Sequence, residues 1–280
     1  MQNYLLFFIG FIVSLVIAFI PAFHEAAFVS HILYGVFAAF VFYYCTFKKL
    51  DFNDNKLYLV CFLYFLATFA FADMLSFGGI NLLLYICVYL FSSIPFGFVL
   101  AKVFADVDIK TLGSNSIGAT NVLRVVKEKD KALAKKLAFA TFALDFLKAF
   151  LPILCAKFAG FDDNVLWSIG VFAVVGHCFS FYLSLEGGKG VATGAGVMAV
   201  LLPLELLIAL CVWFVCIKLF KISSLASLLA ALVFITSSFI IHYDMSINTH
   251  APVILICLIV FYKHIPNIKR MIFKEENKFV

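Results

Sequence analysis

The chain has 280 residues, of which 65% are hydrophobic and 13% are charged, and it contains 36 phenylalanines. Charged residues make up about a quarter of a soluble domain, so this composition excludes an ordinary soluble domain, a disordered chain and a nucleic-acid-binding protein. A mean hydropathy of +1.09 and repeated long apolar runs predict an all-α, polytopic integral membrane protein. The net charge of +5 therefore bears first on topology.

Apolar segments, taken in chain order, predict about ten transmembrane helices. They lie near 4–20, 28–47, 57–77, 81–104, 137–158, 165–184, 190–203, 205–219, 223–241 and 251–263. Three of these segments are shorter than the roughly 17 residues of a full span, so nine is the alternative count.

The distribution of Lys and Arg predicts the orientation of these helices, because cytoplasmic loops carry the excess of basic residues. With both termini in the cytoplasm, 19 of the 21 basic residues fall on the cytoplasmic side. Lys157 lies outside and Lys148 lies within an apolar run. The long segment 105–136 is then a cytoplasmic loop, and its polar, basic composition suggests a functional role.

Two features interrupt the apolar segments with polar groups. Asp145 and Lys148 are three residues apart, which places them on one helix face. They form either a self-compensating ion pair that permits insertion or part of a functional site. In the fourth span, Ser92, Ser93 and Pro95 predict a break in the helix that frees backbone groups.

Glycine-rich and hydroxyl-rich segments supply candidate phosphate ligands on the cytoplasmic side. The segment TLGSNSIGATNVLRV carries backbone and side-chain donors, and its Arg124 can clamp a phosphate with two hydrogen bonds. A polar turn before a helix would look similar. The segment EGGKG lacks the spacing of a Walker A loop but places a lysine between glycines at a helix start, which suits an anion.

Other polar residues leave alternatives open. His177 precedes EGGKG and is either a structural hydrogen-bonding group or part of the anion site. Ser223 and Ser224 are either caps or ligands at another helix start. The eight cysteines lie in or beside apolar runs without paired spacing, so we interpret them as core residues rather than disulfides or metal ligands.

The ordered motifs SSIPFG, GSNSIGATNVLR, DFLKAFLP, GHCFSFYLSLEGGKGVAT, KISSLASLLAAL and KHIPNIKR resemble those of the bacterial acyl-phosphate:glycerol-3-phosphate acyltransferase family, PlsY. The resemblance covers residues 80–275 and implies a seven-span core at 78–280 in the bacterial inner membrane. Residues 1–77 have no counterpart in it and would be additional N-terminal helices, whose role is not predicted. The chain departs from the family pattern at five positions. They are Asn115 for Gly, Ser116 for Asn, Ala149 for Gly, Ser180 for Pro and Glu186 for Lys. Because Asn tolerates positive φ, we expect the turn at Asn115 to persist.

The resemblance implies transfer of a fatty acyl group from acyl-phosphate to glycerol 3-phosphate, giving lysophosphatidic acid and phosphate. It implies that Arg124, Lys148 and His177 bind glycerol 3-phosphate. The residues expected to bind acyl-phosphate are Gly187, Gly188, Lys189 and Gly190. Supporting polar contacts are expected from Ser93, Ser114, Asn121, Ser224 and Asn267. We expect no covalent nucleophile, metal or cofactor. The expected partners are the two substrates and membrane lipid but no nucleic acid, and the sequence leaves protein partners open.

Two other classes of protein remain as alternatives. A transporter of an anionic solute would use Lys148 and the glycine-rich segments as a midplane site. A purely structural reading makes the glycines and serines helix-packing residues.

Overall fold

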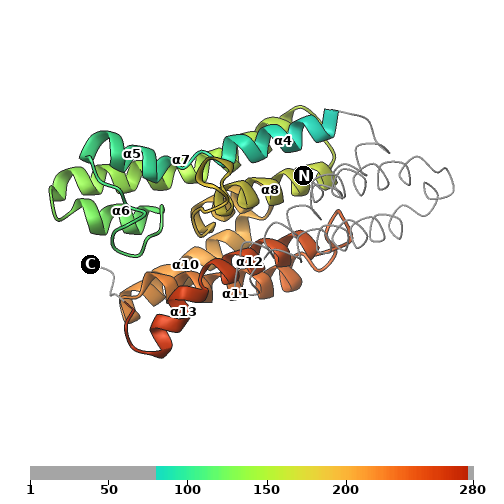
Figure 1. The fold of residues 1–280 in the computed structure, drawn as a ribbon. Coiled ribbons are helices and arrows are strands. Elements are labelled where there is room, and N and C mark those ends of the chain that lie inside the picture. Colours follow the sequence, from blue (N-terminus) through green and yellow to red (C-terminus); the bar gives the residue numbers. More distant parts are fainter. Residues whose placement is uncertain (1–79, 277–280) are drawn as a thin grey trace, which may run out of the picture. The chain divides into compact units, whose positions relative to one another are not determined.

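The computed structural model describes residues 80–276, so the expected spans at 4–20, 28–47 and 57–77 lie outside the described residues. The described part is built from α-helices and one short 3₁₀ turn, η2 (Phe181–Leu183) (Figure 1). The helices are α4 (Ile80–Ser92), α5 (Phe96–Ala105), α6 (Ala119–Val126), α7 (Lys131–Phe158), α8 (Asp163–Cys178), α9 (Val191–Leu201), α10 (Pro203–Phe220), α11 (Ser223–Ile241), α12 (Ala251–Lys263) and α13 (Ile265–Ile272).

Several of these helices have the length and apolar composition of membrane spans, which confirms an all-α membrane fold. Within residues 80–276 there are five such helices, or six when α12 and α13, bent by 53°, are taken as one span. The five include α4 and α5 taken together. The segment expected at 190–203 forms α9, which at 11 residues is too short for a full span. The total of ten and the orientation of the termini stay predictions.

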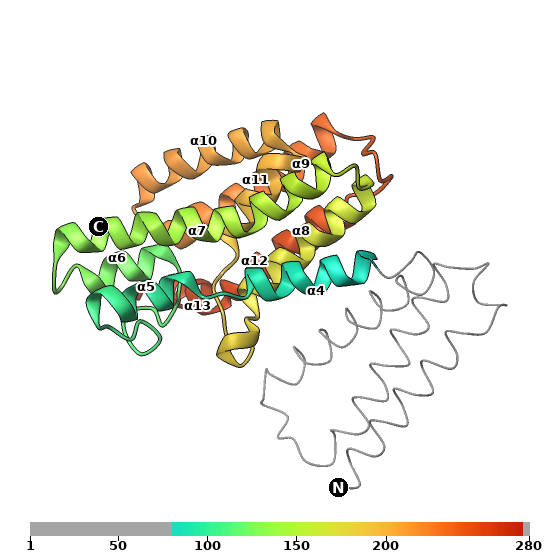
Figure 2. The same cartoon turned by 90° about the horizontal axis from the view of Figure 1, so that it is seen from above.

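Helix α7 is the central element of the described part. Its N-terminus is capped by Asp130, whose carboxylate accepts hydrogen bonds from the backbone N–H groups of Ala132 and Leu133 at 2.7 and 3.0 Å. At 1.5 Å per residue its 28 residues extend for about 42 Å, longer than the apolar core of a bilayer. Four helices pack against α7: α5, α6, α8 and α9 (Figure 2).

The segment 105–136 folds into an ordered element rather than a structureless loop. It forms α6, and its side chains Ile109, Ile117 and Val122 are fully or almost fully buried with Ala101 of α5 and Leu137 of α7. This separate apolar cluster attaches the segment to the ends of α5 and α7. The predicted polar loop thus has a small core of its own, which gives its phosphate-ligand candidates fixed positions.

Two glycines let a helix approach a neighbouring backbone closely, in one case another helix and in the other the segment before α6. A Cβ atom on Gly196 of α9 would lie 2.3 Å from the carbonyl oxygen of Phe146 on α7. A Cβ atom on Gly97 of α5 would lie 2.0 Å from the carbonyl oxygen of Ile117. Only glycine permits these backbone contacts, as is common where membrane helices pack.

Candidate active site

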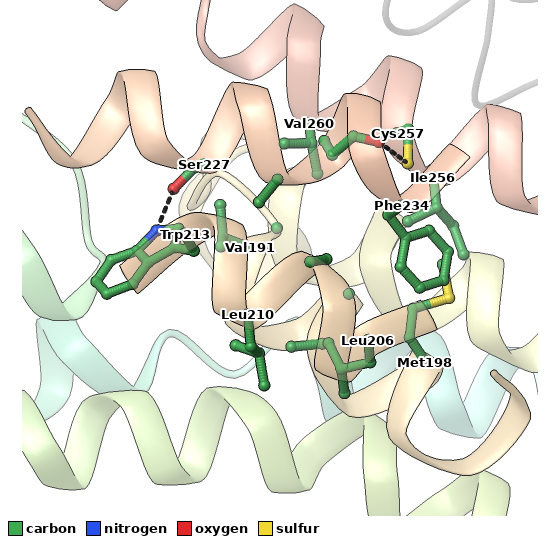
Figure 3. A pocket seen from close by; sticks show the side chains of 16 residues that line it. Val191, Met198, Leu206, Leu210, Trp213, Ser227, Phe234, Ile256, Cys257 and Val260 are labelled. Carbon is green, nitrogen blue, oxygen red and sulfur yellow. Dashed lines mark hydrogen bonds between the residues drawn. The ribbon is translucent and has the colours of Figure 1, made fainter. Parts of the chain in front are cut away.

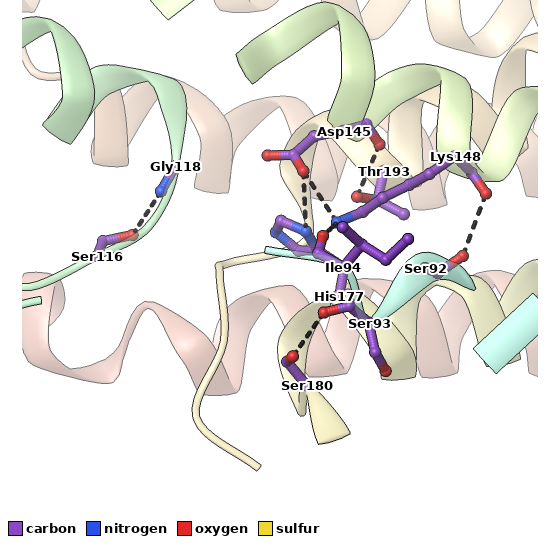
Figure 4. Close-up of polar contacts among 10 residues, drawn as sticks. All are labelled: Ser92, Ser93, Ile94, Ser116, Gly118, Asp145, Lys148, His177, Ser180 and Thr193. Carbon is purple, nitrogen blue, oxygen red and sulfur yellow. Dashed lines mark hydrogen bonds and ion pairs between the residues drawn. The ribbon is translucent and has the colours of Figure 1, made fainter. Parts of the chain in front are cut away.

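Lys148 lies at the centre of the candidate site, in the middle of α7. Its side chain is 1% exposed, and its Nζ lies 2.9 Å from Oδ1 of Asp145. The same ammonium donates a hydrogen bond of 3.1 Å to the carbonyl oxygen of Ile94 (Figure 4). An ammonium has three N–H donors, so one remains for a further acceptor. The ion pair expected from the sequence is therefore present, and it has a second partner that the sequence did not indicate.

The carbonyl group of Ile94 is available because the helix breaks between α4 and α5. Pro95 ends the regular ladder, and residues 93–95 lie outside both helices. Two hydrogen bonds hold the break in place: the Ser92 hydroxyl donates to the carbonyl oxygen of Lys148 at 3.1 Å, and the Ser180 hydroxyl donates to that of Ser93 at 2.5 Å. The predicted break thus supplies an acceptor to the buried lysine.

His177, in the last turn of α8, faces the same carboxylate as Lys148. Its Nδ1 lies 3.5 Å from Oδ1 of Asp145, and its side chain is 4% exposed. Thr193 of α9 fixes the backbone at this point, because its hydroxyl donates to the carbonyl oxygen of Asp145 at 2.9 Å. Asp145 therefore holds together two of the three residues expected to bind glycerol 3-phosphate.

Two glycines of the EGGKG segment pack directly against His177. The backbone N–H of Gly188 donates to the carbonyl oxygen of His177 at 3.0 Å. A Cβ atom on Gly188 would lie 2.0 Å from Nε2 of His177, and one on Gly187 would lie 2.3 Å from the His177 carbonyl oxygen. Gly190 has φ of +82°, a backbone conformation that favours glycine. Steric constraints at Gly187 and Gly188, and the backbone conformation of Gly190, therefore explain why glycine stands at these three positions.

Lys189 lies among several charged side chains contributed by other elements. Burial lowers its pKa to about 8; the carboxylate of Glu276 opposes this shift, while the cations Arg270 and Arg124 add to it. Arg124 of α6 is therefore close enough to Lys189 for its charge to lower the pKa of that lysine. The region combines partly desolvated cations, which is the environment that a phosphate group requires.

Glu276 joins the two supporting residues expected from the last helices. Its Oε1 accepts hydrogen bonds from the Ser224 hydroxyl at 2.9 Å and from Nδ2 of Asn267 at 2.5 Å, and its Oε2 accepts one from Nε of Arg270 at 2.7 Å. Burial alone would raise the pKa of Glu276, but these three hydrogen bonds hold it below its usual value. Ser224 and Asn267 thus meet at an acidic residue that sequence reasoning missed.

Asn121 organises the polar segment before α6. Its Nδ2 donates to the carbonyl oxygens of Ile109, Leu112 and Ser116 at 3.0, 3.1 and 2.8 Å, and its Oδ1 accepts from the backbone N–H of Ser114 at 2.8 Å. The support that Asn121 gives is therefore internal to the segment. Asn115 has φ of 56°, so the turn expected at this substituted position is present.

Two other departures from the family pattern also have partners. Glu186 forms an ion pair of 3.2 Å with Lys110 of the segment before α6. Ser180 uses its hydroxyl to hold the break at Ser93. Sequence reasoning did not single out His264, which lies in the KHIPN motif from which only Asn267 was taken. His264 is buried, and its Nδ1–H donates a hydrogen bond of 2.8 Å to the carbonyl oxygen of Val260.

These observations define a class: a polytopic helical membrane protein with a buried cluster of Lys148, Asp145 and His177 on α7 and α8, and a second group of charged side chains around Lys189. Residues 82–274 match the sequence model of a family described as glycerol-3-phosphate acyltransferase, and the chain belongs to this family. This membership confirms the expected family and an acyltransferase as its class of enzyme; the transporter alternative is not favoured.

Relatives and solved structures agree with this assignment. Glycerol-3-phosphate acyltransferases of Campylobacter jejuni subsp. doylei and Campylobacter lari are each 63% identical to this chain, over 200 and 201 residues respectively. Each alignment covers 71% of this chain and 99% of the relative. The crystal structure of PlsY (YgiH), an integral membrane glycerol 3-phosphate acyltransferase, is similar in its glycerol 3-phosphate form. It has a TM-score of 0.65 and 37% identity, covering 72% of this chain and 96% of that one.

Proposed function

We propose that this protein transfers a fatty acyl group from an acyl-phosphate to the 1-hydroxyl of glycerol 3-phosphate, giving lysophosphatidic acid and inorganic phosphate. The observation that carries the proposal is the arrangement of Lys148 and His177 around Asp145, directly against the glycines that flank Lys189. Two phosphorylated substrates must meet at one point, and His177 links the buried cation Lys148 to the glycine-flanked segment that carries Lys189. Related PlsY structures are described as glycerol 3-phosphate and lysophosphatidic acid forms, which supports the acceptor and the product.

The chemistry needs positioning more than a protein nucleophile. The acceptor oxygen forms a bond to the acyl carbon, the bond from that carbon to the phosphate oxygen breaks, and the hydroxyl proton leaves with the phosphate group. An acyl-phosphate is an activated mixed anhydride, so cations that stabilise the negative charge on the departing phosphate supply much of the acceleration. Lys189 and the N–H groups around it are suited to that task.

We assign the glycerol 3-phosphate phosphate to Arg124, Lys148 and His177, and the acyl-phosphate head group to Gly187, Gly188, Lys189 and Gly190. The shared contact with Asp145 supports grouping Lys148 with His177, whereas the influence of Arg124 on the pKa of Lys189 favours a position of Arg124 near the acyl-phosphate group as well. Supporting polar contacts come from Ser93, Ser114, Asn121, Ser224 and Asn267. For Asn121 and Ser114 the hydrogen bonds within the polar segment favour a role in fixing its conformation.

We further propose that the protein lies in the bacterial inner membrane with ten helices and both termini in the cytoplasm. Residues 1–77 are additional helices and residues 78–280 form the acyltransferase core. The distribution of basic residues supports this orientation. The contacts divide the chain between Tyr85 and Ile86, and all assigned site residues belong to the second unit.

The test is acyl transfer by the purified full-length protein with palmitoyl-phosphate or palmitoyl-CoA as the donor. We expect lysophosphatidic acid from glycerol 3-phosphate and the acyl-phosphate only. Lys157→Ala is a control, since this exposed lysine lies outside the proposed site. Product from the CoA thioester at an equal rate would contradict the assigned donor, and absence of product from both donors would contradict the reaction.

A further inference from the structure

An apolar cavity lies among α9, α10, α11 and α12, beside the EGGKG segment (Figure 3). Each helix contributes residues spaced three or four positions apart, which places them on one face. On α9 these run from Val191 to Met198, and on α11 from Ser227 to Phe234. The cavity therefore follows the helix axes for about seven residues, or roughly 10 Å.

The two ends of the cavity differ in chemistry. One end contains Gly190, which directly follows Lys189, together with Trp213, whose indole N–H donates to the Ser227 hydroxyl at 3.2 Å. The other end is lined by Met198 and Phe234, which are 3% and 4% exposed. Figure 3 shows Trp213 with Ser227 at one end, and Met198 with Phe234 at the other.

Small side chains occupy the middle of the cavity. Gly194, Ala195, Ala209, Ala230 and Ala231 line it between the two ends. This leaves a narrow apolar passage that begins at the proposed acyl-phosphate site and ends against two large, buried side chains. A chain of methylene groups attached to a phosphate held at Lys189 fits this combination of polar start and apolar length.

We propose that the acyl chain of the donor enters this cavity and that Met198 and Phe234 determine how many of its carbons are held there. The inference rests on the proposed function, because it takes the phosphate head group to lie at Lys189. An extended chain advances roughly 1.2 Å per bond, so a passage of about 10 Å holds about eight carbons. Carbons beyond that number gain no contact with the cavity.

The proposal predicts that kcat/KM depends on the length of the donor's acyl chain, and that substitutions in the cavity change this dependence. Each methylene held in the cavity contributes roughly fourfold to kcat/KM. Ala230→Leu fills the middle and shortens the passage by two or three carbons. Phe234→Ala removes the end wall and lengthens it. The two substitutions therefore shift the chain-length profile in opposite directions.

The experiment measures kcat/KM of the full-length protein with butyryl, octanoyl, lauroyl and palmitoyl phosphate, at saturating glycerol 3-phosphate. The quantity compared is the ratio of variant to wild type at each length, since a loss of folded protein lowers this ratio equally for all donors. For Ala230→Leu we expect the ratio to fall at least tenfold between the butyryl and the octanoyl donor. For Phe234→Ala we expect it to rise by about tenfold between the octanoyl and the lauroyl donor.

Two control variants change similar volumes on the outer faces of the same helices. Leu232→Ala on α11 and Cys211→Leu on α10 alter exposed residues that do not line the cavity. We expect flat ratios for both controls. Flat ratios for Ala230→Leu and Phe234→Ala would overturn the inference while leaving the reaction intact. Absence of transfer by the wild type from every donor would instead overturn the proposed function, and the inference with it.

Discussion

At the scale of single residues, Lys148 has both a structural and a proposed functional role. A single substitution would change stability and activity together and could not separate the two roles. Lys148→Met leaves the buried Asp145 carboxylate without its ammonium partner, and we expect a loss of about 3–5 kcal/mol in the free energy of unfolding. The double variant Lys148→Met with Asp145→Asn removes both charges, so stability should largely recover. Acyl transfer should stay reduced by roughly hundredfold or more, because the cation is absent.

Thermal unfolding in detergent and acyl-transfer rates separate these two roles. If the pair only compensated its own charges to permit insertion, the double variant would be as active as the wild type. That outcome would contradict the assignment of Lys148 to glycerol 3-phosphate.

Lys189 gives the site a predicted dependence on pH. Its pKa of about 8 lies below the usual lysine value because the side chain is buried, so the ammonium is charged below pH 8 and neutral above it. Attraction for the acyl-phosphate is therefore present below pH 8 and lost as the pH rises through it. We expect the KM for acyl-phosphate to increase above pH 8 in the wild type.

Lys189→Arg is the matched variant, since a guanidinium stays charged throughout this range. Its KM should remain constant between pH 7 and 9.5, although its absolute value can differ because of the larger head group. The substrate phosphate titrates near pH 6 and affects both proteins equally. An equal increase of KM in Lys189→Arg would assign the titration to another group.

At the scale of elements, the contact between α7 and α9 depends on a single glycine. Gly196→Ala would bring a Cβ atom to 2.3 Å from the Phe146 carbonyl oxygen, so the helices must separate. We expect a loss of about 1–3 kcal/mol in the free energy of unfolding. Gly194→Ala on the same helix is the control, because its Cβ would meet Ile256 at an ordinary distance of 3.6 Å. Thermal unfolding midpoints in detergent compare the two, and equal midpoints would contradict this account of the packing.

Apolar runs predicted the long helices well but missed two short, partly polar ones. The span expected at 251–263 and that at 223–241 match α12 and α11, since runs of this length have few alternatives in lipid. Helices α6 and α13 were not predicted. Each has only eight residues and a mixed polar and apolar composition, so its stability comes from tertiary packing rather than from its own sequence.

At the scale of the whole molecule, we expect the core to be active without its first helices. The Campylobacter relatives match over about 200 residues and nearly their full length, and the family match begins at residue 82. Deleting residues 1–77 removes none of the assigned site residues. The truncated protein, measured in the same acyl-transfer assay after purification, should keep kcat and KM within about threefold. A complete loss of activity in a folded truncated protein would show that the N-terminal segment takes part in the reaction.

The sequence by itself determined the membrane class, the long helices, the family and most candidate site residues, because composition, hydropathy and local spacing are properties of the chain alone. The ion pair of Asp145 and Lys148 was also predictable, since residues three apart share a helix face. Only the tertiary structure decided that His177 faces Asp145, that the Ile94 carbonyl accepts from Lys148, and that Glu276 joins Ser224 to Asn267. These contacts link residues on different elements, so their distances depend on how the helices pack and no local pattern encodes them.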